Sequence, residues 1–385
     1  MTKLFILMAA MLVLVAAACS SDSATTGTSA LPTTSQATTT DAGTPADSTA
    51  PSSSMPEPVV ASVPPPGSFS EVEAEHETAV NEIVAAGRLT MDQLLADDFE
   101  TLWERLDAAT AALLSVEDLR AGKERLTAQA SLGEVTADRA IQLSPSLRFY
   151  GAQLVWGEEA LSAVVSLNGG GEVTGLTLNP QLPLPNDPSA GYRSDVEFRL
   201  PFDGLWFVFW GGDLELENYH VVAQDQRHAL DLVIWNDGAT HVGEGTENSD
   251  YWAYGQPVLS PADGTVVGLA DGLVDNAPQI ESDAENPPGN HVVIEVAPGE
   301  YILIAHMQAG SLSVAEGDSV EQGQQIGLVG NSGNTSEPHI HIHLQDQPAF
   351  DPGATGLPLE FTSYLANGEL VESGELIADQ FVANG

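Results

Sequence analysis

The chain is poor in cysteine and in positively charged residues. Cys19 is the only cysteine among 385 residues, which excludes an internal disulfide framework and a cysteine-rich zinc site. Lysine occurs only as Lys3 and Lys123, and neither lysine nor arginine follows Arg227. With 55 acidic against 11 basic residues, the formal charge is −44. Phosphate and anionic-lipid contacts need clustered lysine and arginine, so we expect no nucleic-acid partner and no polybasic membrane attachment.

The N-terminus carries an apolar run that is too short for a membrane-spanning helix. Residues 4–18 follow Lys3 and end in small side chains, whereas a spanning helix needs roughly 20 residues. The run therefore fits the hydrophobic part of a signal peptide. Ala16-Ala17-Ala18-Cys19 resembles a bacterial lipobox, so residues 1–19 are predicted to be a lipoprotein signal with lipidation at Cys19. The alternative is a plain secretory signal with an incidental cysteine.

The next segment has the composition of a tether. Residues 20–67 consist mainly of Ser, Thr, Ala, Pro and Asp. Such a segment cannot bury enough apolar surface to offset its chain entropy, so we expect it to be disordered. A flexible coil of this length spans about 40 Å. A domain behind it could move within a layer above a membrane.

Residues 68–188 are predicted to form a small α+β domain. Helical periodicity covers 69–87 and 91–114, and Ser115 begins a further capped helix. In the second helix Leu94, Leu106 and Leu113 are expected to share one face. The pattern then changes to the alternation of strands over 146–155, 160–167 and 172–180.

This first domain resembles the small domains similar to nuclear transport factor 2 that precede catalytic domains in secreted bacterial proteins. The resemblance carries no catalytic motif. Its one histidine, His76, is expected to be a solvated residue on a helix. A proline-rich stretch over 180–190 separates this domain from the rest of the chain.

Histidines accumulate beyond this boundary, where eight of the nine lie between His220 and His343. The strongest signal is Pro338-His339-Ile340-His341-Ile342-His343-Leu344. In a strand the three histidines project from one face, while the aliphatic side chains enter the core. Imidazoles in this arrangement suit a zinc site, because some can bind the metal while others handle protons.

Asp231 is a second candidate ligand, because it lies in the apolar run Ala229-Leu-Asp-Leu-Val-Ile-Trp235. A carboxylate is costly to bury there unless it is paired or coordinated, and an ion pair with Arg227 is the alternative. The third ligand is either His220 or His228. An odd offset within one strand points His228 away from Asp231, whereas a polar stretch can fold His220 back toward it. We therefore favour His220 as the ligand beside Asp231. Two histidines, one of them from the strand over 338–344, and one aspartate would leave a fourth position open for water.

These residues, together with Tyr301-Ile-Leu-Ile-Ala-His306 and Gly330-Asn-Ser-Gly, resemble the lysostaphin-type (LytM-type) zinc endopeptidases over about 200–350. The resemblance implies a mainly antiparallel β domain over 190–385. It also implies Asp231 and His341 as Zn²⁺ ligands, and His306 and His339 as catalytic residues that position water and stabilise the oxyanion. The common family pattern places its first histidine where this chain has Arg227. His343 and an upstream ligand histidine resemble one branch of the family.

Together with the predicted lipobox, the resemblance implies an exported, lipid-anchored zinc metalloendopeptidase that hydrolyses the peptide cross-links of peptidoglycan at the bacterial cell envelope. Its predicted partners are peptidoglycan peptides and, through Cys19, the membrane. The alternative is a catalytically inactive LytM-like module that regulates another wall hydrolase. Biotinyl or lipoyl carrier domains, which the segment 320–330 also resembles, are excluded because they need a lysine and none follows Lys123.

Overall fold

The computed structural model describes residues 69–181 and 184–385. The predicted signal peptide and lipobox over 1–19 and the predicted tether over 20–67 lie outside the described residues. Among the residues that are described, no helix is both long and apolar enough to cross a membrane. The predicted fold class is confirmed: a small helical and sheet-containing region precedes a mostly antiparallel sheet domain.

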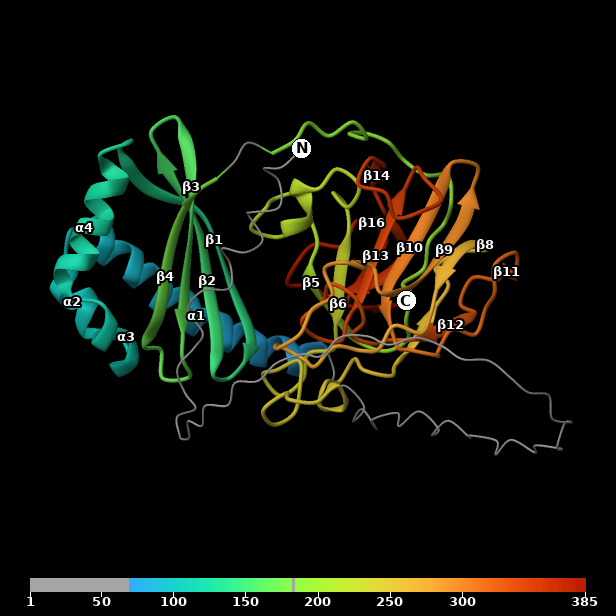
Figure 1. Ribbon diagram of the computed structural model, residues 1–385, viewed down its shortest axis with the longest axis horizontal. Helices are drawn as coiled ribbons and strands as arrows, with labels where there is room; N and C mark the ends of the chain where they lie inside the picture. Colours follow the sequence, from blue (N-terminus) through green and yellow to red (C-terminus); the bar gives the residue numbers. More distant parts are fainter. Residues whose placement is uncertain (1–68, 182–183) are drawn as a thin grey trace, which may run out of the picture. The chain divides into compact units, whose positions relative to one another are not determined.

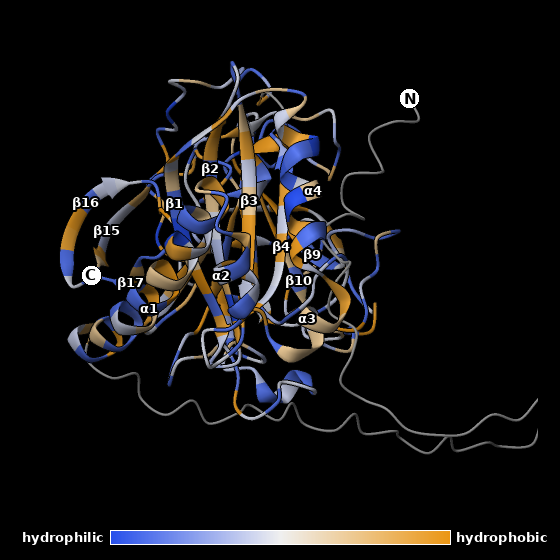
Figure 2. Ribbon diagram, turned by 90° about the vertical axis from the view of Figure 1, so that its left-hand side faces the viewer, coloured by the Kyte–Doolittle hydropathy of each residue, from blue (hydrophilic) through white to orange (hydrophobic). Residues whose placement is uncertain are grey.

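The N-terminal region places helices against an antiparallel sheet, and Figure 2 shows these helices in front of the strands. Its elements are α1 (Phe69–Leu95), α2 (Phe99–Glu104), α3 (Ala108–Leu113), α4 (Val116–Thr127), β1 (Leu132–Ser144), β2 (Leu147–Trp156), β3 (Glu159–Leu167) and β4 (Val173–Pro180). The strands pair in sequence order. Ser115 caps α4 as predicted and forms a reciprocal capping box with Asp118. Strand β1 was not predicted.

The helix boundaries differ from the prediction for identifiable reasons. Helix α1 continues past residue 87 to Leu95. Gly87 lies inside it because a Cβ there would lie 2.0 Å from the ring of the buried Tyr150, so only glycine allows this close packing. The predicted single helix over 91–114 is wrong, because Asp98 and Asp107 each cap a new short helix. Leu113 is consequently 70% exposed instead of joining the core.

The C-terminal region is built on one long antiparallel sheet (Figure 1). The strand order is β11-β8-β9-β10-β13-β6-β5-β17-β15-β16, with β14 paired to β13, and β12 and β7 form a separate pair. The bounds are β5 (Trp206–Trp210), β6 (Leu230–Val233), β7 (Pro257–Leu259), β8 (Gly264–Ala270), β9 (Asn290–Ala297), β10 (Glu300–Met307), β11 (Ser319–Val320), β12 (Gln325–Leu328), β13 (Ile340–Gln345), β14 (Gly356–Leu357), β15 (Phe361–Ala366), β16 (Glu369–Gly374) and β17 (Phe381–Asn384), with 3₁₀ helices η1 (Tyr219–Val222) and η2 (Asn248–Asp250).

The core of this region lies under the strands that carry the histidines. Ile340, Ile342 and Leu344 of β13 are all at most 1% exposed and belong to the main hydrophobic cluster. The aliphatic half of the alternating segment is therefore in the core, as the period of two predicted. His76 is not solvated as expected. Its ring is 9% exposed and lies 4.9 Å from the ring of Phe207, because α1 contributes to an aromatic cluster on β5.

Candidate functional site

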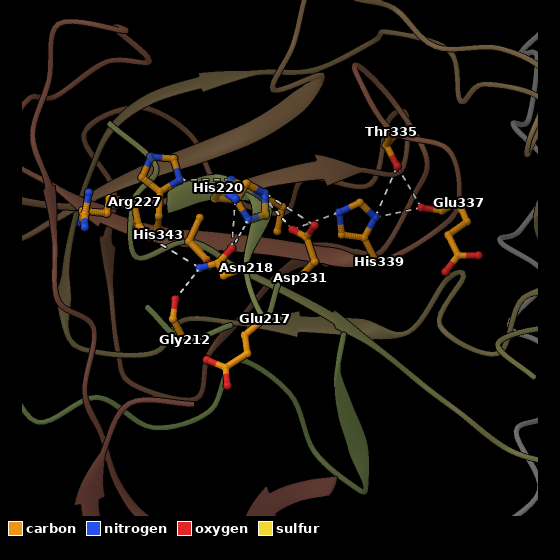
Figure 3. Close-up of polar contacts among 12 residues, drawn as sticks. Gly212, Glu217, Asn218, His220, Arg227, Asp231, Thr335, Glu337, His339 and His343 are labelled. Carbon is orange, nitrogen blue, oxygen red and sulfur yellow. Dashed lines mark hydrogen bonds and ion pairs between the residues drawn. The ribbon is translucent and has the colours of Figure 1, made fainter. Parts of the chain in front are cut away.

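The three central strands β10, β13 and β6 bring the candidate residues together. His341 pairs directly with Asp231 across β13 and β6, and with Ala305 of β10 on its other side. His306 follows Ala305 at a bulge, with φ of 59°, an uncommon backbone conformation for a non-glycine residue. The sheet register therefore decides which side chains meet, and Figure 3 shows Asp231 between His220 and His339.

Asp231 is the centre of the cluster. Its Oδ1 lies 2.8 Å from His341 Nδ1 and 3.4 Å from His339 Nε2, and its Oδ2 lies 3.6 Å from His220 Nε2. The carboxylate is 5% exposed. Burial raises its pKa, but the electrostatic interactions with the surrounding histidines outweigh this effect and hold the pKa well below its usual range. Asp231 is therefore ionised at neutral pH, without the predicted alternative partner, since Arg227 lies beside Asp187 instead.

His220 reaches the cluster from η1, where Asn218 orients it. The Asn218 amide donates to the carbonyl oxygens of Gly212 and Ala229, so its Oδ1 faces His220 and accepts from the imidazole Nδ1 at 2.8 Å. The imidazole proton of His220 is thus on Nδ1, and Nε2 carries a lone pair that points toward Asp231. This Nε2 is buried and has no hydrogen-bond partner. Burial lowers the pKa of His220 to about 3, so protonation does not resolve the contact.

A similar chain of contacts orients His341. The Gln345 amide donates to the carbonyl oxygens of Gln347 and Ala349, which turns its Oε1 toward His343 Nε2 at 2.8 Å. His343 Nε2 therefore carries the proton, and His343 Nδ1 accepts from His341 Nε2 at 3.2 Å. The nitrogen that His341 leaves free for a metal is consequently Nδ1, the one that faces Asp231.

His306 and His339 complete the cluster from the opposite side. His306 Nδ1 donates to Ser332 O and His339 Nδ1 donates to Glu337 O, each at 2.8 Å, so both Nε2 atoms are free to exchange protons. Their ring centroids lie 4.9 Å apart. Burial lowers the pKa of His306 well below 6.5. Burial also acts to lower the pKa of His339, but the charge and hydrogen bond of Asp231, together with the contacts to Glu337, outweigh burial and raise this pKa.

The ligand atoms of two overlapping sets lie close enough to hold a metal ion. One set is His220, Asp231 and His341, and the other is His306, His339 and His341. In the first set all three residues are buried and one is an anion, whereas His339 in the second set is partly exposed. The unpartnered His220 Nε2 and the ionised Asp231 fit a cation such as Zn²⁺, which binds imidazole and carboxylate ligands.

The other histidines lie elsewhere. His228 turns away from Asp231 toward Asp187, Asp213 and Glu375. His241 and His291 belong to neither set.

Sequence reasoning missed the residues that orient the histidines. Gln345 continues the alternation of His339, His341 and His343 by one more step on the same strand face, so it could have been found from the same period of two. Asn218 precedes His220 by two residues and lacks such a signal. Glu337, whose pKa burial raises to about 7, accepts from Thr240 beside His339 and was also missed.

With this geometry in place, the chain can be compared with known proteins. Residues 249–352 match the model of Peptidase family M23, so the chain carries a domain of that family. The resemblance to lysostaphin-type peptidases is thereby confirmed for this part of the chain. The matched segment contains His306, His339 and His341, while His220 and Asp231 precede it. The resemblance of residues 68–188 to nuclear transport factor 2 stays a prediction.

The chain is similar to two curated proteins over short segments. It is 33% identical over 90 residues to the peptidoglycan DD-endopeptidase ShyA of Vibrio cholerae, which is 23% of this chain and 17% of that protein. It is 38% identical over 68 residues to endolysin 2638A of Staphylococcus phage 2638A, which is 17% of this chain and 14% of the endolysin. Each match therefore spans less than one fifth of the relative.

Among solved structures, the chain is similar to the catalytic domain of lysostaphin from Staphylococcus simulans. The sequence identity is 17% and the TM-score 0.24, over 40% of this chain and 88% of that domain. A TM-score of this size does not establish an equivalent arrangement of the two chains.

Proposed function

We propose that the protein is an exported, lipid-anchored zinc metalloendopeptidase that hydrolyses peptide cross-links of peptidoglycan. The observation that carries the proposal is the buried, unpartnered Nε2 of His220, which faces the ionised Asp231 at 3.6 Å. Two atoms that both accept hydrogen bonds face each other in a buried site, and a cation between them would satisfy both lone pairs. The family of residues 249–352 supports zinc as that cation.

In this proposal His220, Asp231 and His341 hold the metal. His220 Nε2, the Asp231 carboxylate and His341 Nδ1 each present a lone pair to the same space. Two neutral ligands and one anion leave a net positive charge on a divalent ion. A zinc ion held there would act as a Lewis acid that polarises the scissile carbonyl and a water molecule.

In this proposal His306 and His339 accept and donate protons during hydrolysis. Because their Nδ1 protons are held by Ser332 O and Glu337 O, each presents Nε2 to the cluster. Burial keeps His306 neutral, so its Nε2 can accept a proton from attacking water. His339 Nε2 lies 3.4 Å from Asp231 Oδ1, so His339 faces the same space and can act as the partner that, once protonated, donates to a developing oxyanion.

We infer the substrate and the location of the protein from its sequence and from its relatives. The lipobox ending in Cys19 predicts export and lipid attachment, and the tether over 20–67 would give reach of about 40 Å above the membrane. We propose the domain over 190–385 as the peptidase and 68–188 as a separate small domain. The short peptides that cross-link peptidoglycan are the proposed substrate, in keeping with the peptidoglycan endopeptidase among the relatives.

The test is digestion of purified cell walls by the zinc-loaded full chain, with mass analysis of the released peptides. Walls with glycine-rich bridges and walls with direct D-amino-acid cross-links are digested in parallel. We expect new peptide termini in one of the two preparations and loss of that activity with a chelator. A chain that binds no zinc and leaves both walls intact contradicts the proposal and favours the regulatory binding module.

A further inference from the structure

A second group of metal-binding residue types shares no member with the first cluster. His228 precedes β6, Asp213 follows β5, and Glu375 follows β16. The Nδ1 atom of His228 lies 3.9 Å from Asp213 Oδ1 and 3.8 Å from Glu375 Oε2. The His228 side chain is 5% exposed, whereas Asp213 is largely in solvent and Glu375 is about one third exposed. The buried imidazole of His228 thus lies beside two accessible carboxylates, those of Asp213 and Glu375.

The hydrogen bonds on the other side of the ring determine the protonation of His228. Ser189 Oγ lies 3.3 Å from His228 Nε2, and it also lies 2.8 Å from both Asp187 Oδ1 and Gly356 O. The single hydroxyl proton is taken by one of these two oxygens, since both can only accept. Ser189 therefore accepts from His228, and the imidazole proton is on Nε2.

The other ring nitrogen, His228 Nδ1, is buried and has no hydrogen-bond partner, and in the neutral ring it carries a lone pair. It points toward two carboxylate oxygens that also carry only lone pairs. The three atoms lie within 4.8 Å of one another, and a cation between them would satisfy all three lone pairs.

The surroundings favour a cation. Asp213 and Glu375 line an open cavity of about 410 Å³, and Glu217 and Glu360 line it as well. The only positively charged side chain in its lining is Arg193, whose guanidinium donates to Glu360 at 2.6 Å. Asp213, Glu217 and Glu375 therefore give the cavity a net negative charge.

We propose that Asp213, His228 and Glu375 form a second site for a divalent transition-metal ion, with Zn²⁺ or Mn²⁺ as the fitting class. One imidazole and two carboxylates are ligands that both ions accept, and the cavity leaves room for water to complete the coordination. The three ligands come from segments far apart in the sequence. A metal ion here would tie the ends of β5 and β16 to the start of β6.

The test counts metal ions on the full-length protein. After dialysis against a chelator, Zn²⁺ and, in a parallel series, Mn²⁺ are added back, and bound metal is measured by equilibrium dialysis with elemental analysis. We expect the double variant Asp213→Asn, Glu375→Gln to bind one equivalent less than the native chain, because amides of the same shape remove the charged ligands. We also expect a lower thermal midpoint of the native chain after metal removal that the double variant does not share in full.

The controls separate this site from the first cluster. The double variant Glu369→Gln, Glu372→Gln removes two exposed charges on β16 outside the cavity lining and should keep the native count. Asp231→Ala should lose a different equivalent, so failure of the first site and failure of the second are distinguishable. An unchanged count in Asp213→Asn, Glu375→Gln overturns the proposal and leaves a protonated His228 paired with the two carboxylates.

Discussion

Asp231 and His341 lie directly opposite each other on β6 and β13, with Asp231 Oδ1 2.8 Å from His341 Nδ1. Because the pairing of two central strands sets this contact, the sheet itself places these two candidate ligands side by side. Preorganisation of this kind lowers the cost of binding, and it makes each side chain in the cluster separately testable.

The first prediction concerns the division of roles. Asp231→Ala and His341→Ala should lose both zinc and wall hydrolysis, because each removes a proposed ligand. His306→Ala and His339→Ala should abolish hydrolysis while largely retaining zinc. Zinc content and peptide release are measured on the same preparations. Equal loss of zinc in all four variants would refute the division.

The second prediction separates His220 from His228. His220→Ala should abolish wall hydrolysis, since His220 Nε2 faces Asp231. His228→Ala should keep hydrolysis, because its ring faces Asp213 and Glu375 instead. Each variant is expected to lose one metal equivalent, so the decisive measurement is activity. A His220→Ala chain with full activity would make His228 the leading candidate for the first ligand.

The third prediction addresses the contact between His343 and His341. His343→Leu removes the acceptor for His341 Nε2–H, and zinc affinity should fall by about 10- to 100-fold, the range for loss of a hydrogen bond to a ligand histidine. His343→Gln supplies an amide that can accept from His341 and donate to Gln345, so it should restore most of the affinity. Nitrogen-15 correlation spectra of the metal-free protein report the tautomer of His341 directly. A His341 tautomer unchanged in His343→Leu would contradict this role.

The fourth prediction uses Glu337, whose pKa burial raises from 4.5 to about 7. In the folded state this carboxyl stays protonated up to about pH 7, whereas the unfolded chain loses the proton near pH 4.5. Its contribution to the free energy of unfolding is therefore complete below pH 4.5 and is lost as the pH rises through 7.

Glu337→Gln keeps the neutral shape, so at pH 8 the metal-free variant should be more stable than the native chain by up to about 3 kcal/mol. The difference should disappear near pH 4.5. Urea unfolding of both proteins across this pH range measures it. Parallel stability curves for the two proteins would show that Glu337 is not the titrating group.

The fifth prediction concerns the support of His306. Gly289 has φ of 58°, and a Cβ there would lie 2.2 Å from the carbonyl oxygen of Ser332, the acceptor for His306 Nδ1. Gly289→Ala should therefore displace Ser332 and reduce hydrolysis while zinc content stays near native. Gly299→Ala is the matched control, because Gly299 also has a positive φ, of 83°, but nothing lies within 4 Å of its Cβ position. Equal loss of activity in the two variants would attribute the effect to backbone strain alone.

Local sequence patterns predict much of the site. The alternation around His341 predicts a strand with histidines on one face and aliphatic side chains in the core, because a strand has a period of two. The apolar neighbours of Asp231 mark its carboxylate as one that needs a partner. Ser115 predicts the start of α4, because capping depends on residues only three apart.

The tertiary structure decided what these patterns could not. His220 and His228 are both plausible partners of Asp231 in sequence, and only the path of η1 and the hydrogen bonds of Asn218 turn His220 toward it. Likewise, α1 passes through Gly87 because the ring of Tyr150, 63 residues away, occupies the space of a side chain. Local sequence determines which face a side chain takes, but contacts between distant segments depend on strand register and packing, which no short window contains.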